Sequence, residues 1–214
     1  LAVGCPRMIT LAGAAEALRN GASPSDKVFD GVYPKALQAI STVHFSPVAV
    51  AVRAAQLFEE AAVQKVLDVG SGVGKFCVIG SLCTKATHFT GVEQRPALVE
   101  VARNSATRMG ANRTEFVEGN AMDVQLGDFD GIYMFNPFFE QISRSRIQVD
   151  ATMPRSRFLF RSYSFNVFRK LSQARTGLKI VTYHGCGFRL PEAFRLVTRE
   201  AAGNDYLSFF NKES

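Results

Sequence analysis

Three glycines at alternate positions follow a short apolar run in this chain of 214 residues. Asp68 stands two residues before Gly70, and Gly72 and Gly74 continue the same spacing. Glycine is needed where a backbone bends sharply and where a ligand comes close to it. A carboxylate beside such a turn can hold the loop or accept a hydrogen bond from a cationic amine. The spacing therefore predicts a nucleotide-type binding loop between a strand and a helix.

Three loop types compete for this stretch. A phosphate-binding P-loop needs Gly and a hydroxyl residue where this chain has Val69 and Phe76, so it is excluded. The dinucleotide fingerprint Gly-x-Gly-x-x-Gly needs its third glycine at Lys75, which argues against a nicotinamide oxidoreductase. The pattern Asp-x-Gly-x-Gly-x-Gly fits at every position.

This pattern resembles the first motif of the class I S-adenosylmethionine-dependent methyltransferases, and the resemblance extends through most of residues 64–214. It implies S-adenosylmethionine as the cofactor. Glu93 stands 19 residues beyond Gly74 and would hold the ribose hydroxyls in charge-assisted hydrogen bonds. Asn120 would lie beside the adenine. The full set of cofactor-binding residues implied in this way is Asp68, Gly70, Ser71, Gly72, Gly74, Glu93, Gln94, Asn120 and Ala121.

A second cluster, Asn136-Pro137-Phe138-Phe139, follows a later apolar run. It resembles the Asn/Asp-Pro-Pro-aromatic motif of methyltransferases that act on amino or amide nitrogen, with Phe138 where proline is usual. The resemblance implies that the Asn136 side-chain oxygen and the Pro137 carbonyl orient the acceptor nitrogen, and that the aromatic residue packs on it. A related Asn-aromatic pattern occurs in class I lysine methyltransferases, which keeps a protein amine as a candidate acceptor.

Other interpretations stay open at this point. An oxygen acceptor would need a base, for which His184 or His44 is the candidate. Phe138 in place of proline also leaves open a fold that binds the cofactor without catalysis and serves as a binding module. Tyr33 and Phe45, the latter in the segment 44–47 before the glycine loop, would either pack over the cofactor as a lid or belong to the core.

Alternating apolar and helical segments must position these residues. Strands are predicted at 65–69, 89–93, 114–118, 129–135 and 178–183, and a β-hairpin at 194–199 and 206–210. Helices are predicted at 75–85, 96–109 and 156–174, the last with Phe158, Phe165, Phe168 and Leu171 roughly in helical register. This order predicts an α/β fold: a seven-stranded, mostly parallel, doubly wound sheet ending in an antiparallel hairpin.

The chain divides into an N-terminal helical extension or lid, residues 1–62, and a cofactor-binding domain, residues 63–214. Residues 1–30 read as a loosely held helix and a loop. Ser46 and Pro47 predict the start of a helix that runs to about Ala62, with the Ser46 hydroxyl as its N-cap.

Charge and composition restrict the partners. The net charge is +6, and residues 141–175 carry eight basic side chains against one acid, Asp150. Such a segment is either a solvated surface or the binding surface for an anionic acceptor, nucleic acid included.

Four scattered cysteines and three distant histidines make a zinc site unexpected, and no apolar run is long enough for a membrane span. A cytoplasmic protein with reduced thiols, no metal and no membrane partner is expected.

Overall fold

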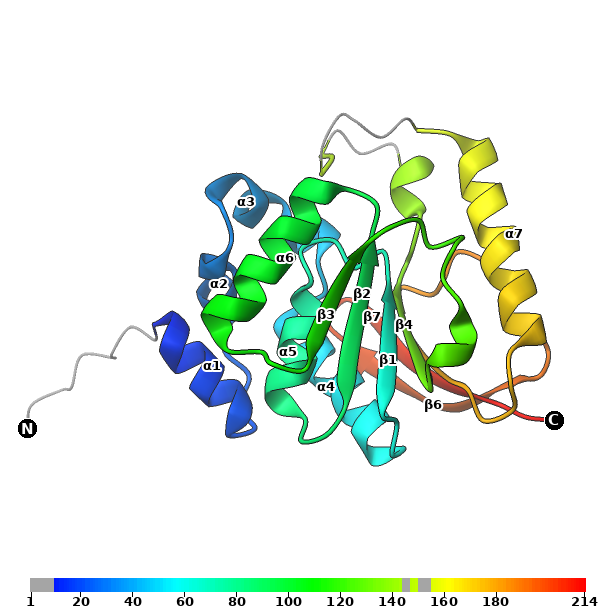
Figure 1. Ribbon diagram of the computed structural model, residues 1–214, viewed down its shortest axis with the longest axis horizontal. Coiled ribbons are helices and arrows are strands. Elements are labelled where there is room, and N and C mark those ends of the chain that lie inside the picture. Colours follow the sequence, from blue (N-terminus) through cyan, green and yellow to red (C-terminus); the bar gives the residue numbers. More distant parts are fainter. Residues whose placement is uncertain (1–9, 144–146, 150–154) are drawn as a thin grey trace, which may run out of the picture.

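Seven strands form one mixed sheet in the order β3-β2-β1-β4-β5-β7-β6 in the computed structural model of this chain (Figure 1). The structure describes residues 10–143, 147–149 and 155–214. The predicted basic segment is therefore covered in part, and Arg144, Arg146 and Asp150 lie outside the described residues, as does Cys5. The strands are β1 (Lys65–Val69), β2 (His88–Glu93), β3 (Thr114–Glu118), β4 (Gly131–Phe135), β5 (Lys179–Tyr183), β6 (Phe194–Ala202) and β7 (Asp205–Lys212).

The sheet has the predicted mixture of directions. Strands β1 to β5 pair in parallel, and β7 is antiparallel to both β5 and β6. The carboxyl ends of β1, β2, β4 and β5 consequently lie at one edge. The sequence prediction of a doubly wound sheet with a closing hairpin is confirmed.

Helices cover both faces of the sheet. On one face pack α4 (Val48–Glu60), α5 (Lys75–Cys83) and α6 (Pro96–Met109), and on the other packs α7 (Arg157–Gln173). Adjacent residues of a strand point to opposite faces: Val66 of β1 belongs to the core under α4 and α5, and Leu67 to the core under α7. Both are fully buried.

The N-terminal extension is held more tightly than the sequence predicted. It forms α1 (Leu11–Arg19), α2 (Asp26–Phe29), a 3-10 turn η1 (Asp30–Val32) and α3 (Lys35–His44). Ala14, Ala15 and Leu18 of α1 are buried. The Arg19 guanidinium donates to the carbonyl oxygen of Met109 at the end of α6. The prediction of a loosely held helix is wrong because a composition rich in alanine did not reveal this packing.

Lys75 joins the extension to the helix after the glycine loop. Its side chain is 3% exposed, and its ammonium group lies 2.6 Å from an Asp26 carboxylate oxygen and 2.7 Å from an Asp30 carboxylate oxygen. A buried charge is tolerated only when it is paired. The residue that argued against a dinucleotide fingerprint therefore has a structural use, as the counter-ion of two acids from the extension.

The start of α4 differs from the prediction. The helix begins at Val48, with Pro47 as the capping position, and the Ser46 hydroxyl bonds the Tyr133 hydroxyl at 2.7 Å instead of the helix end. The Asp26 carboxylate accepts from the Val48 amide at 2.9 Å. The N-cap function that the sequence assigned to Ser46 thus comes from a residue 22 positions before Val48.

Helix α7 begins close to its predicted start, with Ser156 as its N-cap. The Ser156 hydroxyl accepts from the Leu159 amide at 3.3 Å. The other end of the helix is fixed by Lys212 of β7, whose ammonium donates to the Leu171, Ser172 and Ala174 carbonyl oxygens. Cations at a helix C-terminus satisfy its last carbonyls.

The buried side of α7 is formed by Tyr163, Val167 and Leu171. Phe158 and Phe165, which the sequence placed in register with Leu171, are instead 76% and 68% exposed.

Candidate active site

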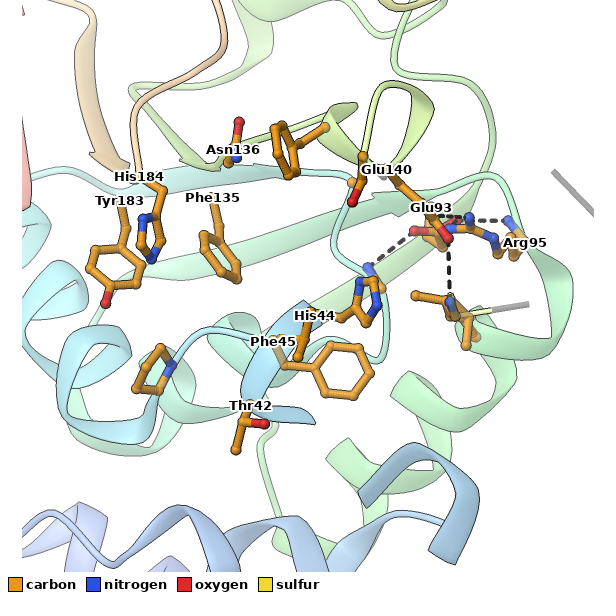
Figure 2. Close-up of a pocket in the computed structure, with 18 of the residues that line it drawn as sticks. Thr42, His44, Phe45, Glu93, Arg95, Phe135, Asn136, Glu140, Tyr183 and His184 are labelled. Carbon is orange, nitrogen blue, oxygen red and sulfur yellow. Dashed lines mark hydrogen bonds and ion pairs between the residues drawn. The ribbon is translucent and has the colours of Figure 1, made fainter. Parts of the chain in front are cut away.

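Three neighbouring cavities lie at the carboxyl edge of the sheet. Their volumes are about 470, 100 and 50 Å³, and Gly70 lines all three. Figure 2 shows the largest of these three cavities, called here the largest cavity of the site, with Tyr183 and His184 on one side and Glu93 on the other. Ligands in open α/β sheets bind at this edge, where strand order changes direction.

The glycine loop crosses this edge in a conformation that favours glycine. Gly70, Gly72 and Gly74 all have positive φ, and the Gly70 and Ser71 amides both donate to the Val92 carbonyl oxygen at 3.0 Å. Gly70 faces open space: a β-carbon there would have no atom within 4 Å. The loop therefore leaves room for a ligand at Gly70.

Gly74 has a different role, because it is packed. A β-carbon at Gly74 would collide with the Phe116 ring and would lie 2.9 Å from the Ala102 β-carbon. This glycine lets α5 approach α6 and β3. Ser71 is packed similarly, with its hydroxyl against Gly91 of β2 and without a hydrogen-bond partner among the described residues.

Glu93 ends β2 as predicted and is 5% exposed. Its two carboxylate oxygens accept from the Gly72 amide at 3.2 Å and the Arg95 amide at 3.0 Å. It lines the two larger cavities. A carboxylate offers about four acceptor positions, so capacity for ribose hydroxyls remains.

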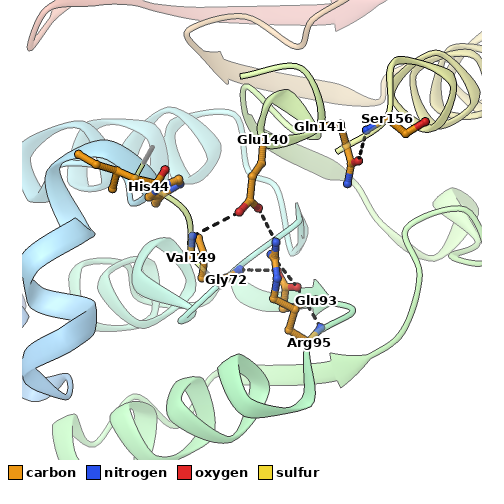
Figure 3. Close-up of polar contacts among 9 residues, drawn as sticks. His44, Gly72, Glu93, Arg95, Glu140, Gln141, Val149 and Ser156 are labelled. Carbon is orange, nitrogen blue, oxygen red and sulfur yellow. Dashed lines mark hydrogen bonds and ion pairs between the residues drawn. The ribbon is translucent and has the colours of Figure 1, made fainter. Parts of the chain in front are cut away.

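Arg95 and Glu140 extend this carboxylate into a network that sequence reasoning missed (Figure 3). The Arg95 guanidinium pairs with Glu140 and lies 3.5 Å from Glu93. Glu140, in the 3-10 turn η3 (Phe139–Gln141), also accepts from the Val149 amide at 3.3 Å. The network connects the β2 carboxylate to the turn after β4. The sequence contained one indication of this network: Arg95 directly follows two predicted cofactor residues, and Glu140 directly follows the predicted acceptor cluster.

Asp68 is a buried carboxylate that has few hydrogen-bond donors and, within the described part of the chain, no cation to offset its burial. It lines the smallest cavity, and among the described residues its single hydrogen-bond donor is the Cys77 thiol at 3.7 Å. Burial raises the pKa of the Asp68 carboxyl to about 7; the thiol contact opposes the rise and the nearby Glu93 charge adds to it. Such a carboxylate fits a cationic ligand group, which would restore the missing charge partner.

Asn120 and Ala121, which the resemblance placed beside the adenine, line the 100 Å³ cavity together with Gln94. The Asn120 side-chain oxygen accepts from the Met122 amide at 2.9 Å, and its amide group donates to the Tyr163 hydroxyl at 3.4 Å. Ala121 lies beside it. Tyr163 was not expected here, because it comes from α7.

The turn after β4 carries the four predicted acceptor residues. Asn136 and Phe138 have φ values of 40° and 67°, which are unusual for residues with a side chain and cluster at functional sites. Asn136 and Phe139 line the largest cavity of the site, whereas Phe138 lines the 100 Å³ cavity and stacks on Tyr163 at 5.0 Å between ring centroids. Pro137 is buried.

Two histidines also line the largest cavity of the site. The His184 Nδ1 atom lies 2.6 Å from an Asp205 carboxylate oxygen, so a residue of the closing hairpin orients this imidazole. The His44 Nε2 atom lies 3.1 Å from the Ile147 carbonyl oxygen. Sequence reasoning had named both histidines but not Asp205.

Phe45 and Tyr33, the two candidate lid residues, occupy different places in the structure. Phe45 lines two of the cavities and packs over the glycine loop, with its ring 3.6 Å from the place of a Gly72 β-carbon. Tyr33 does not line these cavities; it is buried behind Phe45.

These features fit the cofactor implied by the glycine loop. Glu93 offers a carboxylate to the ribose diol, and the buried Asp68 offers one to an ammonium group. Gly70 leaves open space for the ligand, and a separate cavity lies beside Asn120, where the adenine is expected. No group of three His, Cys, Asp or Glu side chains within the described ranges could hold a metal ion. None of the helices in those ranges is long and apolar enough to cross a membrane.

Replacing Glu93 tests the ribose assignment. Glu93→Ala removes charged hydrogen bonds worth about 1.5–3 kcal/mol, so cofactor affinity measured by calorimetry should fall about 10- to 150-fold. Glu93→Asp should be intermediate, because its shorter arm reaches less far. Glu118→Ala is the matched control, since Glu118 pairs with Glu93 in the sheet register and is exposed. An unchanged dissociation constant in folded Glu93→Ala would refute the assignment.

The raised pKa of Asp68 predicts pH-dependent cofactor binding. Below pH 7 this carboxyl is protonated in the free protein and must lose its proton to pair with an ammonium group. Affinity should therefore rise with pH, by up to about tenfold per unit between about pH 5.5 and 7. Asp68→Asn should bind more weakly at pH 7 and lose this slope. A parental slope that persists in Asp68→Asn would assign the titration to another group.

The comparisons with known proteins agree with this geometry. A family model described as a methyltransferase domain matches residues 66–153. No curated protein sequence matches the chain. A solved structure described as a candidate O-methyltransferase from Klebsiella pneumoniae covers 95% of this chain and 98% of its own at 16% identity, with a TM-score of 0.61.

A second solved structure, an RNA methyltransferase from Salinibacter ruber in complex with S-adenosyl-L-homocysteine, covers 79% of this chain and 94% of its own. Its identity is 19% and its TM-score 0.52. At such identities the likeness is one of fold.

Proposed function

We propose that the chain is a class I S-adenosylmethionine-dependent methyltransferase and that it transfers the methyl group to a nitrogen acceptor at the end of β4. The methyltransferase-domain model that matches residues 66–153 supports the first part of this proposal. The cofactor, when bound, supplies an electrophilic methyl group on a sulfonium sulfur. The protein's task is to bind it, to aim the acceptor lone pair at the methyl carbon and to stabilise the charge that develops on the acceptor.

One observation supports nitrogen most directly. Asn136 and Phe139 line the same cavity as Gly70, Gly72 and Glu93. The Asn136 side-chain oxygen and the carbonyl of the next residue are hydrogen-bond acceptors, which suit a substrate that carries N–H groups. Asn136 and Phe138 both have a left-handed backbone, which costs on the order of 1–3 kcal/mol at each residue. The surrounding fold must therefore hold this turn in place.

Oxygen methylation is the second candidate, and the His184–Asp205 pair favours it. A carboxylate at Nδ1 holds an imidazole so that Nε2 can take a proton, as in the serine–histidine–aspartate arrangement. A hydroxyl acceptor needs such a base, whereas a neutral amine does not.

Product analysis tests the proposal. The protein is incubated with S-adenosylmethionine labelled with carbon-13 in the methyl group and with fractionated cell extract, and the labelled product is examined by NMR. The methyl carbon shift distinguishes attachment to nitrogen from attachment to oxygen. Glu93→Ala protein serves as the control for background transfer. Label on oxygen alone would reject the nitrogen proposal and select the second candidate.

A further inference from the structure

The outward side of α7 has an unusual composition for a solvated helix. Phe158, Phe165 and Phe168 are 76%, 68% and 37% exposed. Arg161 and Arg169 are exposed between and beside them. Positions three or four residues apart share one face of a helix. These five residues, called here the α7 stripe, therefore form one continuous strip of alternating rings and guanidinium groups.

The α7 stripe carries positive charge without internal compensation. Arg161 and Arg169 make no hydrogen bond or ion pair with the described residues, and neither does Arg157 in the first turn. The sequence has no Asp or Glu between Asp150 and Glu192. Surface arginines normally stand among acids, so the α7 stripe itself is complementary to a polyanion.

The stripe also lies close to the candidate active site. The Ser156 amide, at the start of α7 (Figure 1), donates to the Gln141 side chain of η3 at 3.3 Å (Figure 3). Tyr163, on the inner side of α7, lines the 100 Å³ cavity. A ligand lying along α7 from Phe168 to Phe158 would approach the turn after β4. From Phe158 to Phe168 the stripe offers a track of about 15 Å along the helix axis.

We propose that the α7 stripe binds single-stranded nucleic acid, with the phenylalanine rings stacking on bases and the arginines on phosphates. Aromatic side chains interleaved with basic ones are the usual platform for unpaired bases. A membrane fits less well, since a helix lying on lipid separates its apolar face from its basic face. A second copy of the chain also fits less well, because two such faces would repel each other.

The test measures binding without methyl transfer, so its outcome is independent of which acceptor atom is methylated. Fluorescence anisotropy with a labelled oligouridylate of about 12 nucleotides gives the dissociation constant at several salt concentrations. Phe165→Ala and Phe158→Ala should each weaken binding about 5- to 150-fold with an unchanged salt slope. Arg161→Ala and Arg169→Ala should each reduce the slope of log affinity against log salt by about 0.7.

Matched controls come from another surface. Lys35→Ala and Lys85→Ala remove exposed basic side chains from α3 and from the turn after α5, on the opposite face of the sheet from α7, and should leave oligonucleotide binding as in the parent.

Several results would overturn the proposal. They are no oligonucleotide binding at low salt, phenylalanine variants that bind like the parent, or a duplex of equal length bound as tightly as the single strand. Two further results would contradict the proposal and identify a different partner. In one, Phe165→Ala leaves oligonucleotide binding unchanged but abolishes binding to phosphatidylserine vesicles, which would identify a membrane as the partner. The other is a dimer, seen by sedimentation, that Phe165→Ala dissociates.

Discussion

Asn136→Ala should slow methyl transfer about 100- to 1000-fold in single turnovers with saturating cofactor, and cofactor affinity should change far less. The reason is that the substitution removes one of two orienting acceptors at the reacting nitrogen, and the loss of one such electrostatic group costs roughly 3–4 kcal/mol of transition-state stabilisation. The measurement is the rate of methyl transfer after rapid mixing, with affinity measured separately by calorimetry.

The backbone at Asn136 requires a matched variant. Its φ of 40° is strained for alanine but not for glycine, so Asn136→Gly removes the side chain while it permits the native turn. Both variants should lose the same rate if orientation is the cause. A rate restored in Asn136→Gly would assign the loss to backbone strain.

His184→Ala completes the comparison. Little change there, with a large loss at Asn136, supports nitrogen methylation, because a neutral amine needs no protein base. The reverse pattern would contradict it and indicate an oxygen acceptor. Parental rates in both variants would mean that the turn after β4 is not the acceptor site.

Lys75→Met should destabilise the protein by about 3–5 kcal/mol, measured as the free energy of unfolding in urea. Removal of one member of a buried ion pair leaves the other charge buried without a partner. Asp30 is 5% exposed, so it cannot recover its hydration without local opening. Unfolding should be followed by circular dichroism, and cofactor binding should weaken in parallel because Lys75 also lines the smallest cavity.

Arg53 provides the control for Lys75. It also pairs with two acids, Glu60 and Glu200, but its side chain is 33% exposed. Arg53→Met should cost at most about 1 kcal/mol. Adding Asp30→Asn to Lys75→Met should recover part of the lost stability. A loss below about 1 kcal/mol in Lys75→Met, or no recovery in the double variant, would show that the buried pair is not a main source of stability.

The sequence was informative wherever the physical signal was local. The β1 run, the glycine spacing and the strand periodicity depend on neighbouring residues, and β3 has the predicted bounds, Thr114–Glu118. Pairings between distant residues were invisible. Asp26 caps α4 in place of Ser46, and Asp205 reaches His184 from the closing hairpin.

The exposed rings of α7 illustrate the same limit. Helical register states which residues share a side, but not which side faces the core. Tyr163 and Val167 face inward, and Phe158 and Phe165 face outward. Within the site, Glu93 and the glycines followed from a motif, whereas Arg95 and Glu140 became significant only because the turn after β4 approaches the end of β2.

The two outer glycines of the loop should have different evolutionary histories. Gly74 is enclosed by Phe116 and Ala102, so a larger residue there requires prior changes at both neighbours. Gly70 borders open space, and only its backbone conformation and the ligand limit it. In a descendant that no longer binds the cofactor, selection on Gly70 would relax first, and asparagine, which tolerates positive φ, could replace it. Gly74 would persist as long as the helix and strands stay packed, and it would drift only together with residues 102 and 116.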